Sequence, residues 1–375
     1  MKVKPFGVLP AMFIMTLSVG LVNHVLVVPL LLTAAKRDAW LCVLLALAVL
    51  LPWSAIPLYG LLARLNKQRF DVWLQKRMPA IIAHVIIAIF LVLLLLSAYE
   101  TLVVTASWTA TTYLPNTPPM VVCFVFLGLC LFASNAGLRT IAYVSCILLP
   151  LVVVLGDFVM SANMPHKDYR FLLPMLENGM PPVMKGALYC LTATGELFSL
   201  LFIQHHIRGK IKRWHLLGLV LVLALLAIGP ATGAIVEFGP AEAEKMRYPA
   251  FAQWRLVSIG NYIEHVDFFA VFQWLSGALI RMSLAIHIIS EFGPFRKMRR
   301  SWITYVVLGT PLFAASYYGI YHTIPYQKVI LWCFTYFGLF IAAFVILIWL
   351  LSFIRSKRDP SGARREGYGK EAEAG

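Results

Sequence analysis

Three charged residues lie deep inside long apolar stretches of this 375-residue chain, namely Glu100, Glu196 and Arg281. A charged side chain inside a bilayer is costly, so it usually faces a partner of opposite charge or a cavity. Two interpretations therefore stay open. Either Arg281 forms a structural ion pair with Glu100 or Glu196, or the three residues belong to a ligand-binding site.

Three other carboxylates lie nearer to the ends of apolar stretches, and a structural role is favoured for each. Asp157 is close enough to the end of its stretch for its side chain to reach the membrane surface. Glu264 and Asp267 stand at the expected start of a helix, where the positive end of the helix dipole stabilises carboxylates.

Residues 191–198 (LTATGELF) are the most suggestive local segment, because two threonines, a glycine and a glutamate make a poor lipid-facing helix. A break in the helix here would free backbone amides and carbonyls to hold a small polar ligand. Residues 18–24 (SVGLVNH), before Pro29, form a similar weak point. The alternative for both segments is ordinary packing of small residues between helices.

Other kinds of chemistry have no recognisable motif. There is no HExxH or Cys/His spacing for a metal, and no glycine-rich nucleotide loop after a strand. The six cysteines lie in apolar segments as packing residues. His205 and His206 adjoin a basic segment at a helix end, where cations suit the dipole. We therefore expect no enzyme activity, no cofactor and no metal site.

The elements that position these residues must be membrane helices. Hydrophobic residues make up 60% of the chain and charged residues only 13%, against roughly 25% charged residues in soluble domains. The mean hydropathy is +0.80. The net charge of +15 comes from short clusters between apolar runs, without the interleaved aromatic residues of a nucleic-acid surface. The partner that this composition predicts is the lipid bilayer, with no nucleic acid.

Apolar runs predict an all-α polytopic membrane protein with ten transmembrane helices. Most of the 32 lysines and arginines fall in the N-terminus, the C-terminal tail and every second loop, so both termini are expected in the cytoplasm. The predicted spans are residues 7–35, 39–62, 80–112, 119–136, 139–162, 182–207, 214–236, 262–292, 301–321 and 326–354.

Ten spans divide into two halves of five, and an odd number per half inverts the second half, as in inverted-repeat transporters. The expected units are a first repeat at 7–162, an outside connecting loop at 163–181, a second repeat at 182–354 and a disordered cytoplasmic tail at 355–375. The two weak points then fall in spans one and six, the matching first helices of the two halves.

Several short segments, in order along the chain, carry a family resemblance. They are 34–40 (AAKRDAW), 97–101 (SAYET), 114–118 (LPNTP), 137–142 (GLRTIA), 172–179 (LLPMLENG), 185–188 (KGAL), 195–196 (GE), 248–249 (YP) and 261–267 (NYIEHVD). Together they resemble the B subunits of endospore germination receptors, the spore germination permease family of the amino acid–polyamine–organocation superfamily. The resemblance runs from about residue 7 to about residue 355.

The resemblance implies a LeuT-like 5+5 inverted repeat with broken helices 1 and 6, in a sensor of small nutrients of the spore inner membrane. It also implies two partners, a membrane-anchored A subunit and a lipoprotein C subunit. Two positions depart from the family pattern. Residues 22–24 (VNH) replace a glycine–small pair in the first helix, and His205 replaces a proline.

Our hypothesis is a germinant-sensing subunit that binds a small nutrient at mid-membrane and signals to its partner subunits, with an amino acid as the expected nutrient. The expected ligand contacts are Gly20, Asn23, Thr194, Gly195 and Glu196, and the supporting residues are Glu100, Arg281, Tyr99 and Glu264. The main alternative is an ion-coupled amino acid transporter of the same fold, and a less favoured one is a channel-forming subunit. The identity of the nutrient and the coupling ion stay open.

Overall fold

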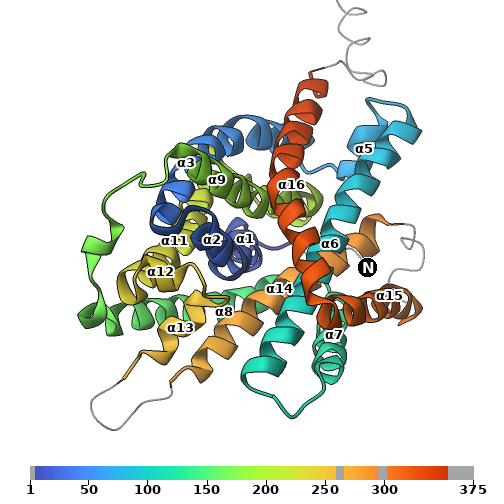
Figure 1. Ribbon diagram of the computed structural model, residues 1–375. Coiled ribbons are helices and arrows are strands. Elements are labelled where there is room, and N and C mark those ends of the chain that lie inside the picture. The colour runs from blue at the N-terminus through green and yellow to red at the C-terminus, as the bar shows by residue number, and fades with distance from the viewer. Residues whose placement is uncertain (1–4, 259–265, 294–301, 354–375) are drawn as a thin grey trace, which may run out of the picture.

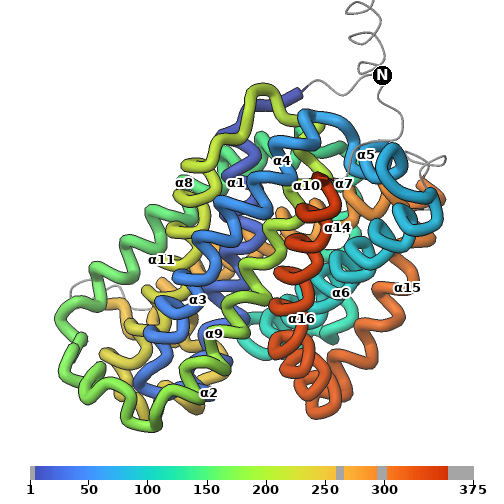
Figure 2. Tube along the Cα trace, turned by 90° about the horizontal axis from the view of Figure 1, so that it is seen from above, coloured from blue at the N-terminus to red at the C-terminus, as the bar shows by residue number. Residues whose placement is uncertain are grey.

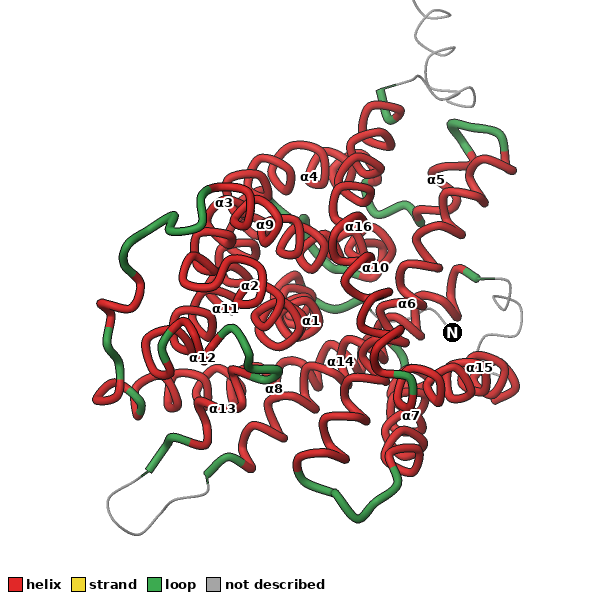
Figure 3. Tube along the Cα trace, in the orientation of Figure 1, coloured by secondary structure: helices red, strands yellow, loops and turns green. Residues whose placement is uncertain are grey.

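The computed structural model describes residues 5–258, 266–293 and 302–353, and within them the chain is helical. Loops join the helices (Figure 3), and the longer connection at residues 163–179 contains two 3₁₀ turns. Outside the helices, Phe6 and Ile207 form an isolated bridge that ties the start of the chain to the end of the sixth predicted span. No strand occurs in the described ranges.

The α-helices follow the predicted spans closely, and the bounds of 80–112 and 119–136 coincide with them. In chain order they are α1 (Val8–Leu21), α2 (Val28–Ala35), α3 (Ala39–Trp53), α4 (Tyr59–Leu65), α5 (Phe70–Gln75), α6 (Ala80–Thr112), α7 (Pro119–Ala136), α8 (Leu138–Ala162), α9 (Met180–Gly195), α10 (Leu200–Ile203), α11 (Arg213–Phe238), α12 (Pro240–Ala243), α13 (Pro249–Arg255), α14 (Phe268–Phe292), α15 (Trp302–Tyr321) and α16 (Thr323–Leu351).

Nine helical stretches among the described residues are long and apolar enough to cross a membrane. The first of them, Val8–Leu65, has 58 residues, whereas one crossing needs about 20. Its backbone leaves the helical region at Lys36, where φ is 51°, and the chain then turns back, as Figure 2 shows for α2 and α3. Large apolar side chains such as Phe132 and Ile81 stay exposed on the outside of the bundle, as lipid contact requires.

The first span changes helix type where a break was expected. After α1 the residues Val22–Val27 form a π-helix, and α2 continues from Val28. Pro29 gives a physical reason, because it lacks the N–H that would bond to the carbonyl of Val25 and its ring would clash with that carbonyl. A wider π turn relieves both problems. The weak point is therefore a widened helix, and its backbone stays helical.

The sixth span likewise changes type without unwinding. After α9 come a 3₁₀ turn at Glu196–Ser199, the short α10 and a second 3₁₀ turn at Gln204–His206. Residue Glu196 keeps φ −58° and ψ −10°, which is close to helical geometry. The expected breaks in helices 1 and 6 are thus helix-type transitions at the predicted positions, and no extended backbone separates half-helices there.

Span six lies at the centre of the bundle. In its most apolar 18-residue window 89% of the residues are buried, against 17% for α8 at the periphery. Helix α9 packs against α2, α3 and α16, while α14 packs against α1, α6, α7 and α8. Figure 1 shows these as two groups, with α16 passing between them. Helix α11 joins the two groups, because it packs against α3 of the first and α1 of the second.

The loops gather into two sets. In one set, Lys36 pairs with Glu244 at 3.2 Å and the backbone N–H of Leu176 donates to Asp38 at 2.8 Å. In the other, the amide of Gln204 donates to the carbonyl of Gln68 at 2.5 Å. The first set contains only loops predicted outside, and the second only loops predicted inside. This grouping agrees with the predicted alternation of the spans.

Candidate ligand-binding site

Arg281 is the hub of a buried polar cluster in the middle of α14. Its Nε donates to Oε2 of Glu196 at 3.2 Å, and its Nη2 donates to Oε1 of Glu196 at 2.5 Å and to Oε2 of Glu100 at 3.3 Å. Its Nη1 donates to Oγ1 of Thr101 at 2.6 Å. The hydroxyl of Ser97 donates to Oε1 of Glu196 at 3.1 Å. We call these five residues the polar centre.

Three spans supply the polar centre. Ser97, Glu100 and Thr101 are spaced three and four apart on α6, so they share one face of that helix. Glu196 opens the 3₁₀ turn that follows α9, and Arg281 projects from α14. Of the two interpretations of the sequence, the ion pair is therefore present, and it includes both glutamates. The sequence missed Ser97 and Thr101, because single hydroxyl residues are common in membrane helices.

The polar centre is not balanced in charge or in hydrogen bonds. Arg281 is 1% exposed, and it is the one cation shared by the carboxylates of Glu100 and Glu196. The second carboxylate oxygen of Glu100, Oε1, is buried and has no hydrogen-bond partner among the described residues, and the hydroxyl of Tyr326 is in the same situation. An unpaired buried polar group costs about 1–3 kcal/mol, more if charged. A donor that enters the centre would recover this cost.

Asn23 and Thr194 lie together, as expected for residues of spans one and six. The Asn23 amide donates to the Thr194 hydroxyl at 3.4 Å, and Asn23 is 1% exposed. Both residues line a small cavity of about 10 Å³ with apolar side chains of α3 and α11. A cavity of this volume holds a water molecule at most. The pair therefore links the two spans and leaves no space for a ligand beside it.

Gly20 lines a larger cavity of about 270 Å³ between α1, α8, α11, α13 and α14. A Cβ atom at Gly20 would meet the side chain of Leu226 at 2.8 Å. The polar groups of this wall are largely engaged. His24 Nδ1 lies 3.2 Å from the carbonyl of Leu226, and the Gln273 amide donates to the carbonyl of Val152 at 2.9 Å. Asp157 also lines the cavity.

The cavity and the polar centre are one helical turn apart. Gly277 lines the cavity, and Arg281 follows it four residues later on the same helix, about 6 Å along the axis. On the cavity side, Trp274 also lines the cavity, and its Nε1 donates to Oγ1 of Thr105 at 3.1 Å. Thr105 stands one turn from Thr101 on α6. The two helices therefore carry the cavity wall and the polar centre in successive layers.

The remaining predicted residues point elsewhere. A side chain at Gly195 would meet Ile341 of α16 at 3.3 Å. The hydroxyl of Tyr99 donates to the carbonyl of Ala315 at 3.3 Å, and its ring stands edge-on to Tyr326 at 6.0 Å. Glu264 lies outside the described residues. The structure thus unites Glu100, Glu196 and Arg281, pairs Asn23 with Thr194, and places Gly20 and Gly195 against different neighbours.

Comparison with known proteins gives the context of this site. A family profile described as "Spore germination protein" matches residues 2–318. The chain is 40% identical over 275 residues to spore germination protein XB of Bacillus anthracis, covering 73% of this chain and 77% of that protein. It is 21% identical over 257 residues to spore germination protein B2 of Bacillus subtilis (strain 168), covering 65% and 67%.

The profile spans well over half of the chain. Nine described helical stretches are long and apolar enough to cross a bilayer. Both relatives are named as spore germination proteins. The chain is an integral membrane protein of the spore germination permease family.

Proposed function

We propose that this chain is the nutrient-sensing subunit of a spore germination receptor and that an amino acid binds at its polar centre. The observation that carries the proposal is the imbalance of that centre. Two carboxylates share one guanidinium, and Oε1 of Glu100 is buried with no donor in the part of the chain that the structure describes. Family membership supports a role in spore germination.

An amino acid has the groups that this imbalance needs. Its ammonium group would donate to Glu100 Oε1 and to Glu196, whose side chain is 17% exposed and therefore accessible. A guanidinium has five N–H donors. The hydrogen bonds of Arg281 to Glu100, Glu196 and Thr101 use four of them, which leaves one for the ligand carboxylate.

The other predicted contacts have supporting roles in this proposal. The Asn23–Thr194 hydrogen bond holds span one against span six beside the centre. Gly20 and Gly277 allow α1 to approach α11 and α14 closely. Both line the 270 Å³ cavity one turn away, which would take an apolar ligand side chain. Gly195 permits the close approach of α16, and Tyr99 and Glu264 act outside the direct contacts.

Signalling would follow from the three-span origin of the polar centre. A ligand carboxylate that takes the place of Glu100 or Glu196 beside Arg281 would change how strongly α6, α9 and α14 are held together. The ligand can shift the equilibrium between two packings of the bundle only by the difference in its affinity for them. The chain would cross the spore inner membrane ten times as two inverted halves, with both termini in the cytoplasm. Membrane-anchored A and lipoprotein C subunits would then detect the shift.

Spores that carry Glu196→Gln in place of the native chain test this proposal. The substitution keeps the size of the side chain and removes its charge. A hydrogen bond to a charged group contributes about 1.5–3 kcal/mol, so the dose–response curve for amino acid germinants should move to concentrations about tenfold higher or more. Glu242→Gln is the matched control, because the Glu242 side chain is 62% exposed in the short helix α12. An unchanged curve, with normal protein levels, would refute the site.

A further inference from the structure

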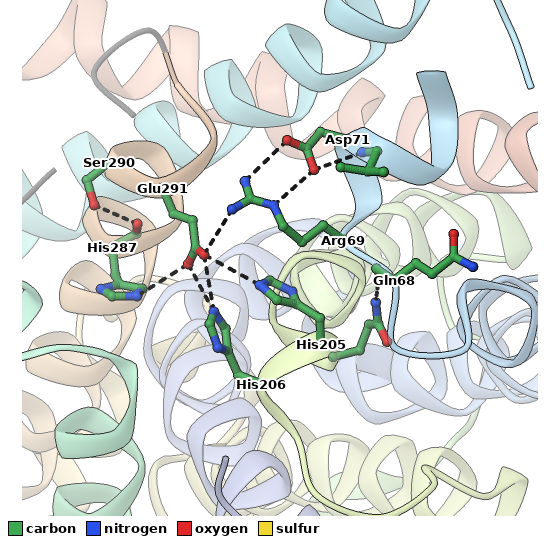
Figure 4. A network of polar contacts seen from close by, with 10 residues as sticks. Gln68, Arg69, Asp71, His205, His206, His287, Ser290 and Glu291 are labelled. Atoms are coloured by element: carbon green, nitrogen blue, oxygen red, sulfur yellow. Dashed lines mark hydrogen bonds and ion pairs between the residues drawn. The ribbon is translucent and has the colours of Figure 1, made fainter. Parts of the chain in front are cut away.

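A second polar cluster lies at the C-terminal end of span six, whereas Glu196 of the polar centre lies within that span. His205 and His206 end the second 3₁₀ turn of that span, and Glu291 lies at the end of α14 (Figure 4). The Nε2 atom of His205 is 3.4 Å from Oε1 of Glu291, and the Nε2 atom of His206 is 3.2 Å from Oε2. One ligand atom from each of the three residues lies within 4.8 Å of the others.

These spacings are those of ligands around one metal ion. Zinc bonds to histidine nitrogen and carboxylate oxygen are about 2.0–2.1 Å long, so two ligands of a tetrahedral ion are about 3.3 Å apart. The distances from Glu291 oxygens to the nitrogens of His205 and His206 are 3.4 and 3.2 Å. Glu291 is only 3% exposed, and both histidine side chains are 10% exposed. The donor atoms are therefore already gathered and mostly dehydrated.

His287 offers a fourth ligand from one turn earlier on α14. Its Nε2 lies 3.6 Å from Oε2 of Glu291, and its Nδ1 lies 3.1 Å from the backbone carbonyl of Ser134. A carbonyl accepts only from a protonated nitrogen, so Nδ1 carries a proton and Nε2 is the ring nitrogen on the side of Glu291. Metal-binding histidines are commonly oriented by such a hydrogen bond.

Arg69 and Asp71 are the described charged residues beside the cluster. Arg69 approaches Oε1 of Glu291 at 3.6 Å, but it also pairs with Asp71 at 3.1 Å (Figure 4). The guanidinium of Arg69 also lies over the ring of Phe292, 4.8 Å from its centroid, which holds it at the edge of the cluster.

We propose that His205, His206 and Glu291 bind a divalent transition metal ion of the zinc class, with His287 as the fourth ligand. Imidazole and carboxylate donors in a tetrahedral arrangement favour zinc over calcium or magnesium. The ion would clamp the end of span six to the end of α14. Zinc binding here does not depend on the proposed germinant site, because none of these ligands belongs to the polar centre.

Zinc binding to the purified full-length chain tests the proposal. The protein is purified without a histidine tag, stripped with a chelator and titrated with ZnCl₂ in a calorimeter. The expected result is one equivalent bound, with a chelator-reversible rise in Tm. His206→Ala and Glu291→Gln should each weaken binding at least about tenfold, since even outer-shell changes cost 10–100-fold. His166→Ala, at an exposed position, should not.

Cobalt gives a readout that needs no variant. Co²⁺ added to the metal-free wild-type chain should produce the intense visible absorption of a tetrahedral site, and one equivalent of Zn²⁺ should remove it. The absence of stoichiometric zinc binding by the wild type would overturn the proposal. So would equal affinity in His206→Ala and Glu291→Gln, which would mean that zinc binds at other surface groups.

Discussion

Arg281 is the residue on which the polar centre depends. It is 1% exposed and bonds to two glutamates and a threonine from two other spans. Taking ions out of water costs several kcal/mol each, and the mutual attraction offsets this only while every partner remains. Loss of the arginine would leave the buried Glu100 and the partly buried Glu196 as two uncompensated carboxylates.

The substitution Arg281→Met should therefore lower the free energy of unfolding by about 3–5 kcal/mol, the usual effect of breaking a buried ion pair from one side. The triple variant Arg281→Met, Glu100→Gln and Glu196→Gln should recover a large part of this loss, because no charge is then left unpaired. Thermal denaturation of the detergent-solubilised proteins measures both. If the single variant were as stable as the wild type, the polar centre would not be an ion-paired core.

At this scale the sequence predicted the charged partners but not the full site. Unusual charge in an apolar stretch identified Glu100, Glu196 and Arg281, and opposite charge predicted their pairing. The direction of Gly195 could not be predicted, since a glycine has no side chain and its neighbour, Ile341, is supplied by a distant helix. The cluster at Glu291 was missed because His206 and Glu291 are 85 residues apart in sequence.

Helix α16 is the element that packs most closely on span six. A Cβ atom at Gly338 would meet the backbone nitrogen of Thr192 at 2.5 Å, so the two helices touch backbone to backbone. The Thr192 hydroxyl donates to the carbonyl of Phe334 at 2.7 Å across the same contact. Small residues that allow such an approach are typical of helix packing in membranes. This contact holds α16 against the end of α9 just before Glu196.

The change Gly338→Ala should lower stability by about 1–3 kcal/mol, because overpacking against backbone cannot be relieved by a rotamer change. Gly218→Ala in α11 is the matched control. Nothing lies within 4 Å of a Cβ at Gly218, and alanine favours helix by up to about 1 kcal/mol. Its Tm should be unchanged or higher. Equal Tm values for Gly338→Ala and the wild type would show that the α9–α16 contact is looser than described.

The elements themselves were largely predictable from hydropathy. The bounds of α6 and α7 coincide with the predicted spans, and the weak points of spans one and six fall where helix type changes. What the sequence could not determine was the kind of change. Pro29 removes one hydrogen bond, and whether the chain unwinds or widens depends on the packing of Val22 and Val27, which are fully buried.

The whole molecule is a bundle whose loops gather into two sets at opposite ends of the helices. Alternation of basic and less basic loops predicted which loops belong together. The contacts Lys36–Glu244 and Gln204–Gln68 agree with it. Sensing and transport use the same bundle, so the arrangement of helices does not separate them. Measured transport of amino acids across the membrane does distinguish a transporter from a sensor.

Proteoliposomes that contain this chain alone should not accumulate radiolabelled amino acids above the level of empty liposomes. The polar centre is enclosed by an ion pair that must rearrange, and a sensor needs only a shift between packings. The measurement is uptake with an imposed proton or sodium gradient, with Arg281→Met as a further control. Gradient-dependent accumulation by the wild type would favour the ion-coupled transporter over the sensor.

The central claim, that an amino acid binds at the polar centre, is tested most directly by ligand binding to the purified chain. Each proteinogenic L-amino acid is added in turn to the wild type, Glu196→Gln and Glu242→Gln, and the shift in Tm is measured. The account predicts that one or a few amino acids raise the Tm of the wild type and Glu242→Gln but not of Glu196→Gln. Equal stabilisation of Glu196→Gln, or none of the wild type, would contradict it.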